Sequence, residues 1–296
     1  MASRLSRLGC AALAAVVLLA AAVGGVVWFL DDAHPRAASR TCTATLDGTP
    51  WSLSADQADN AALIAVTATQ RGLPARAATI GLATALQESR LINIDYGDRD
   101  SIGLFQQRPS QGWGTVEQIM DPVYSTGKFY DGLVRVPGYT ELPVTEAAQA
   151  VQRSGFPDAY AQHEGRSRAW ASALTGYSPA VLHCDLGPAA GPGDPDAVAA
   201  RVQRDFGGTV TPAVDAAAGD GVVVVLDAAG LAGVSGGDAA RSAWAVAQWA
   251  VATAEALGVE RVDVAGGRWD RTADAWTPDP EGDRPAAGTV ALTLAP

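Results

Sequence analysis

The chain has 296 residues, 21 Lys and Arg against 32 Asp and Glu, and a formal net charge of −11. This acidic balance argues against binding to nucleic acid or to the surface of anionic lipids, because both require positively charged surfaces.

Residues 11–30 contain no charged side chain, with Arg4 and Arg7 before them and Asp31 and Asp32 after them. Twenty apolar residues are enough to span a bilayer. The positive-inside rule then places residues 1–10 in the cytoplasm and the bulk of the chain outside the cell membrane. We therefore expect a single-pass transmembrane anchor at 11–30 and a short stalk at 31–41. Secretion after cleavage of a signal peptide, with a small-residue site at 20–22, is the alternative.

The cysteines are consistent with an exported protein. Cys10 precedes the apolar stretch, so Cys42 and Cys184 are the only pair on the exported side. Exported chains in an oxidising compartment commonly pair such residues. We expect a Cys42–Cys184 disulfide, and two unpaired thiols are the alternative.

Residues 42–184 have the pattern of a mainly helical domain. Ser54 and Gln57 have the spacing of a capping box, which predicts a helix that ends near Gly72. A second helix, with Pro74 in its first turn, is expected to carry Glu88 in its last turn. Further helices are expected at 115–120, 122–134, 145–153 and 158–174.

Glu88 lies in an unusual position for a carboxylate, because the end of a helix carries the negative end of the helix dipole. Turn-forming residues follow it, and then a short segment, 102–106, which Gly103 marks as a bent strand or bulge. One acid is thus expected at the end of a helix, opposite an extended segment that bears Gln106 and Gln107. This is the outline of a sugar-binding cleft.

Here the sequence resembles a known family. Glu88-Ser89, followed fifteen residues after the Glu by Gly103-Leu-Phe-Gln106, resembles the catalytic signature of lytic transglycosylases and goose-type lysozymes. These enzymes share the lysozyme-like fold and cleave the glycan strands of peptidoglycan. Two further segments, Asp121-Pro-Val-Tyr-Ser125 and the residues 150–155, resemble later motifs of the family. The similarity covers about residues 51–175.

The resemblance implies a peptidoglycan lytic transglycosylase that cleaves the MurNAc–GlcNAc β-1,4 bond with a single Glu. Glu88 would first donate a proton and then accept one from the muramic C6 hydroxyl, which gives a 1,6-anhydro product. An acid in this role needs a pKa raised by a partly apolar site, for which Ile92, Leu104 and Phe105 are candidate walls. The expected substrate-binding residues are Ser89, Gln106, Gln107, Gln152, Tyr130 and Tyr160, although both tyrosines also suit an ordinary core. No cofactor is expected, and the three histidines show no metal-ligand spacing.

Other interpretations remain open. A hydrolase would use Asp95, Asp98 or Asp100 as a second carboxylate, although acids in a turn are more simply explained as turn formers. Val151 and Gln152 stand where the family carries Tyr-Asn, which leaves open a catalytically degenerate protein that binds glycan or has a structural role in the cell envelope. Tyr160 could supply a phenol from a shifted position.

The last third of the chain resembles nothing that we recognise. Residues 185–195, rich in Pro and Gly, are expected to form a linker, and 196–296 a small α/β domain of unknown function. Strands are expected at 222–226, 262–265 and 289–294, and a helix at 238–257. This domain contains no catalytic or phosphate-binding motif and is a candidate site for an envelope protein partner. The sequence thus predicts an N-terminal transmembrane helix, a mainly α (α+β) lysozyme-like domain and a small α/β domain.

Overall fold

A computed structural model describes residues 40–215, 221–278 and 285–296. The predicted cytoplasmic tail at 1–10, the anchor at 11–30 and nearly all of the stalk at 31–41 lie outside these ranges. Within them, no helix has the length and apolar character needed to cross a bilayer.

The predicted fold class was wrong. The chain is 45% helix and 19% strand, with two antiparallel sheets, so it is a mixed α/β protein rather than a mainly helical domain followed by a small α/β domain. The reason is that strands occur at both ends of the region expected to be helical. These strands are only four to six residues long, and they lack the long apolar runs by which strands are recognised.

The helices of the first region lie close to their predicted positions. Helix α2 (Ala55–Gln70) begins at the predicted capping box of Ser54 and Gln57, and α3 (Ala75–Ser89) begins after Pro74. Asp121 caps α5 (Pro122–Leu133) by accepting a hydrogen bond from the backbone N–H of Val123. The remaining helices are η1 (Pro109–Gln111), α4 (Val116–Met120), α6 (Val144–Gln152), η2 (Ala161–His163) and α7 (Glu164–Leu174).

A three-stranded antiparallel sheet, in the order β2-β1-β3, joins the two ends of this region. Strand β1 (Thr41–Leu46) pairs with β2 (Thr49–Ser54) through a hairpin and with β3 (Leu182–Asp185) across the chain. Cys42 faces Cys184 in this register, and the two form the predicted disulfide. The expected covalent link is thus confirmed.

The C-terminal region contains a six-stranded antiparallel sheet in the order β4-β5-β9-β6-β7-β8. Strand β9 (Thr289–Leu294) has its predicted bounds and lies between two neighbours, while β4 and β8 form the edges. The other strands are β4 (Thr211–Asp215), β5 (Val223–Asp227), β6 (Val259–Val264), β7 (Gly267–Asp270) and β8 (Ala275–Thr277), and the helices are α8 (Pro195–Phe206), α9 (Ala229–Ser235), α10 (Ala239–Ala252) and α11 (Ala254–Leu257).

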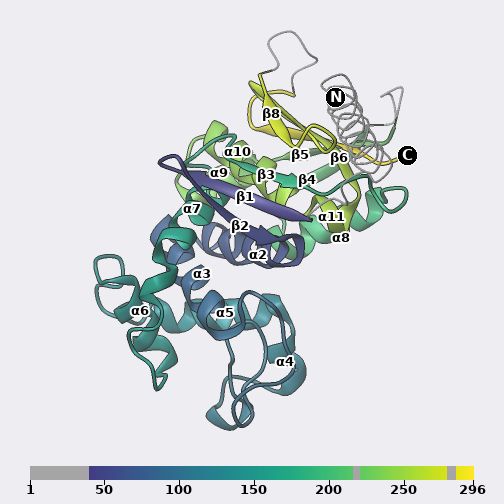
Figure 1. Cartoon of the computed structure of the whole chain (residues 1–296). Coiled ribbons are helices and arrows are strands. Elements are labelled where there is room, and N and C mark those ends of the chain that lie inside the picture. Colours follow the sequence, from purple (N-terminus) through teal and green to yellow (C-terminus); the bar gives the residue numbers. More distant parts are fainter. Residues whose placement is uncertain (1–39, 216–220, 279–284) are drawn as a thin grey trace, which may run out of the picture. The chain divides into compact units, whose positions relative to one another are not determined.

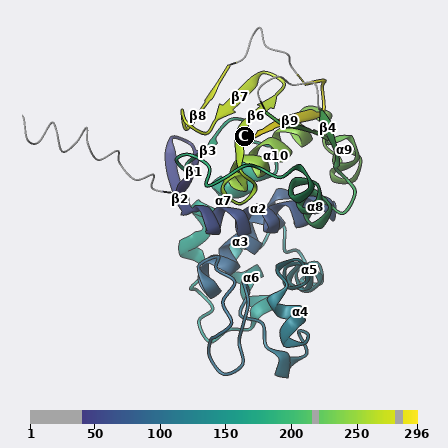
Figure 2. The same cartoon turned by 90° about the vertical axis from the view of Figure 1, so that its right-hand side faces the viewer.

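Helix α10 connects this sheet to the rest of the described chain. It contacts β6 and β9 on one side and α2, α7 and β3 on the other (Figures 1 and 2). Its buried Gln248 donates hydrogen bonds to the carbonyls of Ala173 and Ser178 and accepts two from the backbone N–H groups of Val181 and Leu182. All four hydrogen-bonding positions of this amide are thereby filled by the first region.

A second polar link joins α8 to α2. Both terminal nitrogens of Arg201 bind the carboxylate of Asp59, at 2.7 and 2.9 Å, and its Nε binds the buried Asp205 at 2.8 Å. Asp205 also accepts a hydrogen bond from the indole of Trp249 in α10. Figures 1 and 2 show α4, α5 and α6 on the side of α2 and α3 that lies away from the six-stranded sheet, and these elements build the site described below.

We predict that replacing Cys42 and Cys184 by Ala lowers the free energy of unfolding by about 4–5 kcal/mol, because the disulfide spans 142 residues and restricts the unfolded chain. The measurement is urea unfolding without reductant. Both proteins should also carry Cys10→Ser, so that no other thiol reacts. Equal unfolding midpoints and slopes for the two proteins would show that the link does not stabilise the fold.

Candidate active site

The position of Glu88 is fixed by the turn that ends α3. Arg90 and Leu91 both have left-handed backbones, with φ of 57° and 59°, and the N–H of Leu91 binds the carbonyl of Ala85 six residues back. Two side chains of α2 hold this turn: Gln57 donates to the carbonyl of Arg90 at 2.7 Å, and Asn60 to that of Leu91 at 2.9 Å. The last turn of α3, which carries Glu88, is therefore anchored to a buried helix.

The segment that follows is tied to the same helix end. The hydroxyl of Ser89 is buried and donates to the carbonyl of Leu104 at 2.8 Å. Ser89 thus positions the segment, and it does not line the cavity that contains Glu88. Gly103 has a φ of 79°, and a Cβ at this position would come within 2.9 Å of the carbonyl of Ile119, so only glycine fits. The predicted bent strand is a turn closed by one bridge between Ile102 and Gln107.

Glu88 lies in a cavity of about 370 Å³, which we call the Glu88 lobe. Three predicted binding residues, Gln106, Gln107 and Gln152, also line it. Each amide is held by a backbone carbonyl of another segment: Gln106 donates to Tyr96, Gln107 to Ser125 in α5, and Gln152, in α6, to Phe105. The structure thus places these three residues in the lining of the cavity that contains Glu88.

Tyr160 lies directly against Glu88. Its hydroxyl donates a hydrogen bond to Oε1 of Glu88 at 2.6 Å, and its side chain is buried. Tyr130, by contrast, is buried in the core, where its hydroxyl donates to the carbonyl of Ile64 and its ring packs edge-on against Phe129. Of the two candidate tyrosines, only Tyr160 belongs to the site.

Burial raises the pKa of Glu88 above its ordinary value, while hydrogen bonds from Tyr160 and Gln152 partly oppose this effect. Burial and the neighbouring Glu88 carboxyl also raise the pKa of the Tyr160 phenol, which therefore stays protonated and remains a donor. The expected apolar walls were wrong: Leu104 and Phe105 are fully buried in the core, and Phe105 stacks on Phe129. The lining of the Glu88 lobe is mainly polar.

The three aspartates considered as a second carboxylate lie in different surroundings. Asp100 accepts a hydrogen bond from the N–H of Ser110 at 2.8 Å and forms an ion pair with Arg108 at 2.7 Å; these contacts hold its pKa well below the usual range. Asp98 is exposed and lines the Glu88 lobe, whereas Asp95 is exposed and does not. Only Asp98 therefore shares the cavity with Glu88.

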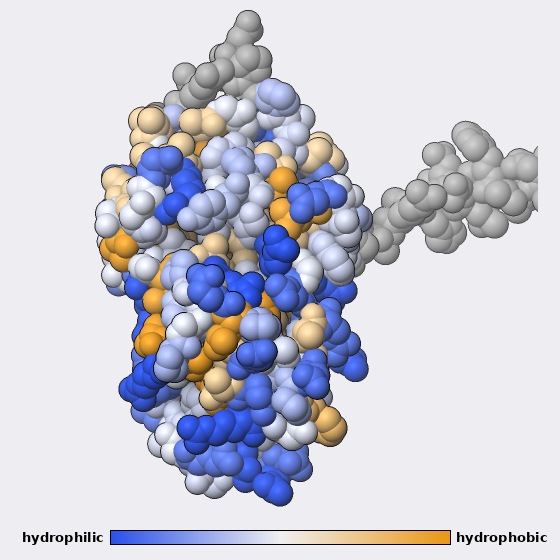
Figure 3. Space-filling view, turned by 90° about the vertical axis from the view of Figure 1, so that its left-hand side faces the viewer, coloured by the Kyte–Doolittle hydropathy of each residue, from blue (hydrophilic) through white to orange (hydrophobic). Residues whose placement is uncertain are grey.

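The structure adds residues to the site that the sequence patterns did not indicate. Trp113 and Arg153 line the Glu88 lobe and also a neighbouring cavity of about 650 Å³. We call this second cavity the Arg135 lobe, and the two together the cleft. Phe156 lines the Glu88 lobe and is 77% exposed. On the face of the molecule shown in Figure 3, hydrophilic residues predominate and hydrophobic ones occur in small groups.

Comparisons with known proteins give no family for this chain. No model of a known protein family matches it, and neither does any of the curated proteins. In the part of the chain that the structure describes, no group of three His, Cys, Asp or Glu side chains is placed to hold a metal ion. The chemistry of the site therefore has to be inferred from Glu88 and its surroundings.

We predict that Tyr160→Phe raises the pKa of Glu88 further, because the phenol hydrogen bond stabilises the ionised carboxylate. The measurement is a pH titration of the carboxyl 13C chemical shift of Glu88, assigned by its loss in Glu88→Gln. Tyr177→Phe is the matched control, since the Tyr177 hydroxyl binds Arg241 and not Glu88. A Glu88 pKa that is unchanged or lower in Tyr160→Phe would contradict the proposed contact.

Proposed function

We propose that this protein cleaves the β-1,4 glycosidic bond between MurNAc and GlcNAc in peptidoglycan, with Glu88 as a single acid and base. The observation that carries this proposal is the environment of Glu88. It is a carboxyl group whose pKa is raised by burial, it contacts a neutral phenol, and it lies in a cleft lined by amides, arginines and aromatic rings. An acid protonated near neutral pH is what protonation of a glycosidic oxygen requires.

The reaction needs no group beyond those of the cleft and the substrate. Protonated Glu88 donates its proton to the glycosidic oxygen as the bond from that oxygen to the anomeric carbon breaks, and positive charge develops on the sugar ring. The carboxylate that remains then accepts the proton of the C6 hydroxyl, whose oxygen bonds to the anomeric carbon. Glu88 ends protonated, as it began, and the product is a 1,6-anhydro sugar.

Two features support the single-acid form of the proposal. Asp100 is neutralised by Arg108 and by the N–H of Ser110, so it is not available as a second carboxylate. The phenol of Tyr160 lies 2.6 Å from Oε1 of Glu88 and stabilises the carboxylate after the proton has left. Gln152 contributes a further hydrogen bond to the same carboxyl group.

The position of Asp98 supports a second candidate, a hydrolase. Asp98 lines the Glu88 lobe, where a carboxylate can activate water or stabilise the charged sugar. The disulfide supports action outside the cytoplasm in either case, because such links persist in oxidising compartments. Peptidoglycan lies in such a compartment.

We predict that digestion of purified peptidoglycan by the protein yields 1,6-anhydromuramyl ends, identified by mass spectrometry. Asp98→Asn should then remain active to within a few-fold of the unmodified chain. Reducing muramyl ends, together with inactivity of Asp98→Asn, would instead assign the hydrolase. The absence of any product over a range of pH and of glycan sources would contradict both and favour a protein that only binds glycan.

We predict that Glu88→Gln lowers the cleavage rate by about 10²–10⁴-fold, because it removes the titrating proton while keeping the shape. The same change should stabilise the fold at pH 7. When folding raises the pKa of a carboxyl group, the folded protein becomes less stable as the pH rises through that pKa. An amide does not titrate and has no such effect. Thermal unfolding at pH 4 and pH 7 measures the second effect, and the gain should shrink at the lower pH.

Glu146→Gln, on the exposed face of α6, is the matched control for both measurements. It should leave the cleavage rate and the pH dependence of stability unchanged. Retention of activity in Glu88→Gln would rule out Glu88 as the acid. If Glu88→Gln is inactive because it is unfolded, the result shows only a structural role for this side chain.

A further inference from the structure

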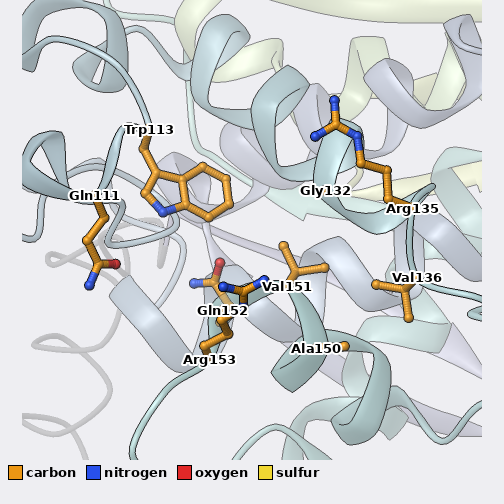
Figure 4. Close-up of a pocket in the computed structure, with 9 residues that line it drawn as sticks. All are labelled: Gln111, Trp113, Gly132, Arg135, Val136, Ala150, Val151, Gln152 and Arg153. Carbon is orange, nitrogen blue, oxygen red and sulfur yellow. The ribbon is translucent and has the colours of Figure 1, made fainter.

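The Arg135 lobe is the larger part of the cleft and has no role in the bond cleavage described above. Its cavity of about 650 Å³ lies between α5 and α6 and the loop that carries Trp113 (Figure 4). It shares four residues with the Glu88 lobe, so a ligand chain can extend continuously from one lobe to the other; they are Gln111, Trp113, Gln152 and Arg153. The nine residues that line it are Gln111, Trp113, Gly132, Arg135, Val136, Ala150, Val151, Gln152 and Arg153.

The charge of this lobe is opposite to that of the protein. The chain carries a net charge of −11, yet the described residues that line the lobe include two arginines and no acidic side chain. In Figure 4 the guanidinium of Arg153 lies between the side chains of Gln152 and Val151, on the side of the cavity that faces Trp113. The lobe is therefore a local positive site on an acidic molecule.

Among the residues that the structure describes, these two arginines differ from the other arginines of the cleft in having no counter-ion. Arg108 pairs with Asp100 at 2.7 Å, and Arg99 lies 3.9 Å from Asp98. Among residues 40–215, 221–278 and 285–296, no acidic side chain forms an ion pair with Arg135 or Arg153. A guanidinium with free N–H groups binds a carboxylate through two parallel hydrogen bonds, which an ammonium cannot do.

Trp113 supplies the apolar part of the same site. Its ring is half-buried and lies where the two lobes meet, and Val136 and Val151 provide further apolar surface nearby. An aromatic face packs against a sugar ring, while the arginines suit a charged group attached to that ring. The combination fits a saccharide that carries a carboxylate better than it fits a neutral saccharide.

We propose that the Arg135 lobe is a binding subsite for carboxylate groups carried by the glycan, with Arg135 and Arg153 as the anion-binding residues and Trp113 as the platform for the sugar. This inference rests on the proposed function, because it assigns the glycan to the whole cleft. It adds that the protein selects acidic glycan strands over neutral ones. The selection occurs at a distance from the bond that is cleaved.

The test compares two forms of one ligand. Soluble peptidoglycan fragments with free carboxylates are prepared, and one half is converted to amides with a carbodiimide and ammonia. Binding of each half to the full chain carrying Glu88→Gln, which does not consume the ligand, is measured by calorimetry. The acidic form should bind about tenfold more tightly at low salt, and the difference should shrink in 0.5 M NaCl, because exposed charge pairs are screened.

Arg153→Gly and Arg135→Gln should each reduce this preference by about threefold, and the two together should remove nearly all of it. Arg153 suits the glycine substitution because it ends α6 in a left-handed backbone, with φ of 53°, which glycine adopts without strain. Loss of selectivity in this variant therefore does not reflect unfolding, and thermal unfolding checks this. Arg40→Gly, also left-handed and exposed but outside both lobes, is the matched control.

Equal affinity for the two forms would overturn the inference, and so would a preference that persists in the double variant. If the unmodified chain also cleaves both forms equally well, the proposed function stands without the subsite. If neither form binds and neither is cleaved, the proposed function fails and the subsite with it.

Discussion

The candidate site depends on the hydrogen bonds by which α2 holds the end of α3. A carboxylate in the last turn of a helix meets the unfavourable end of the dipole, and two consecutive left-handed residues after it add backbone strain. Gln57 and Asn60 stabilise that turn from a helix that is itself buried. Because the turn is fixed, Ser89 can tie the next segment to the helix, and the carboxyl of Glu88 is held against Tyr160.

The two proposals follow from one property of the cleft, which is its uneven distribution of charge. Burial raises the pKa of Glu88, and the Tyr160 phenol donates a hydrogen bond to its carboxyl group. The arginines of the Arg135 lobe have no partners of opposite charge among the described residues, although acidic residues outnumber basic ones in the chain. A glycan strand matches both lobes if its glycosidic bond lies at Glu88 and its charged groups lie farther along the strand, in the Arg135 lobe.

The fold could be predicted from the sequence where the signal is local. Three elements can be recognised from neighbouring residues alone, and the structure has them at the expected positions: the capping box at Ser54, the Asp-Pro pair at Asp121 and the apolar run of β9. Strands β1 and β3 could not be found in this way, because each is short and their pairing joins residues far apart in the sequence. Helix α8 begins with the same Asp-Pro signal, at Asp194, but the Pro and Gly residues before it resemble a linker.

The site was predictable to a similar extent. Glu88, Gln106 and Gln107 are close in sequence, and their spacing indicated a cleft that the structure also forms. Tyr130 and Tyr160 could not be told apart from sequence, because their environments depend on packing: a Cβ on Gly81 would come within 2.7 Å of the Tyr130 hydroxyl, which shows how closely that ring is enclosed. Trp113 has a local signal, a tryptophan between two glycines in a loop, which indicates an aromatic side chain held near the surface.

The disulfide has a mechanical consequence. Cys42 is the second residue of β1, and Cys184 is the third of β3. A tensile force applied between Arg40 and the C-terminus passes directly from one cysteine to the other through the sulfur atoms. The covalent path of this load bypasses residues 43–183, which include Glu88 and both lobes of the cleft. The chain that forms the cleft therefore cannot be drawn out by this force, whereas the C-terminal region is exposed to forced unfolding.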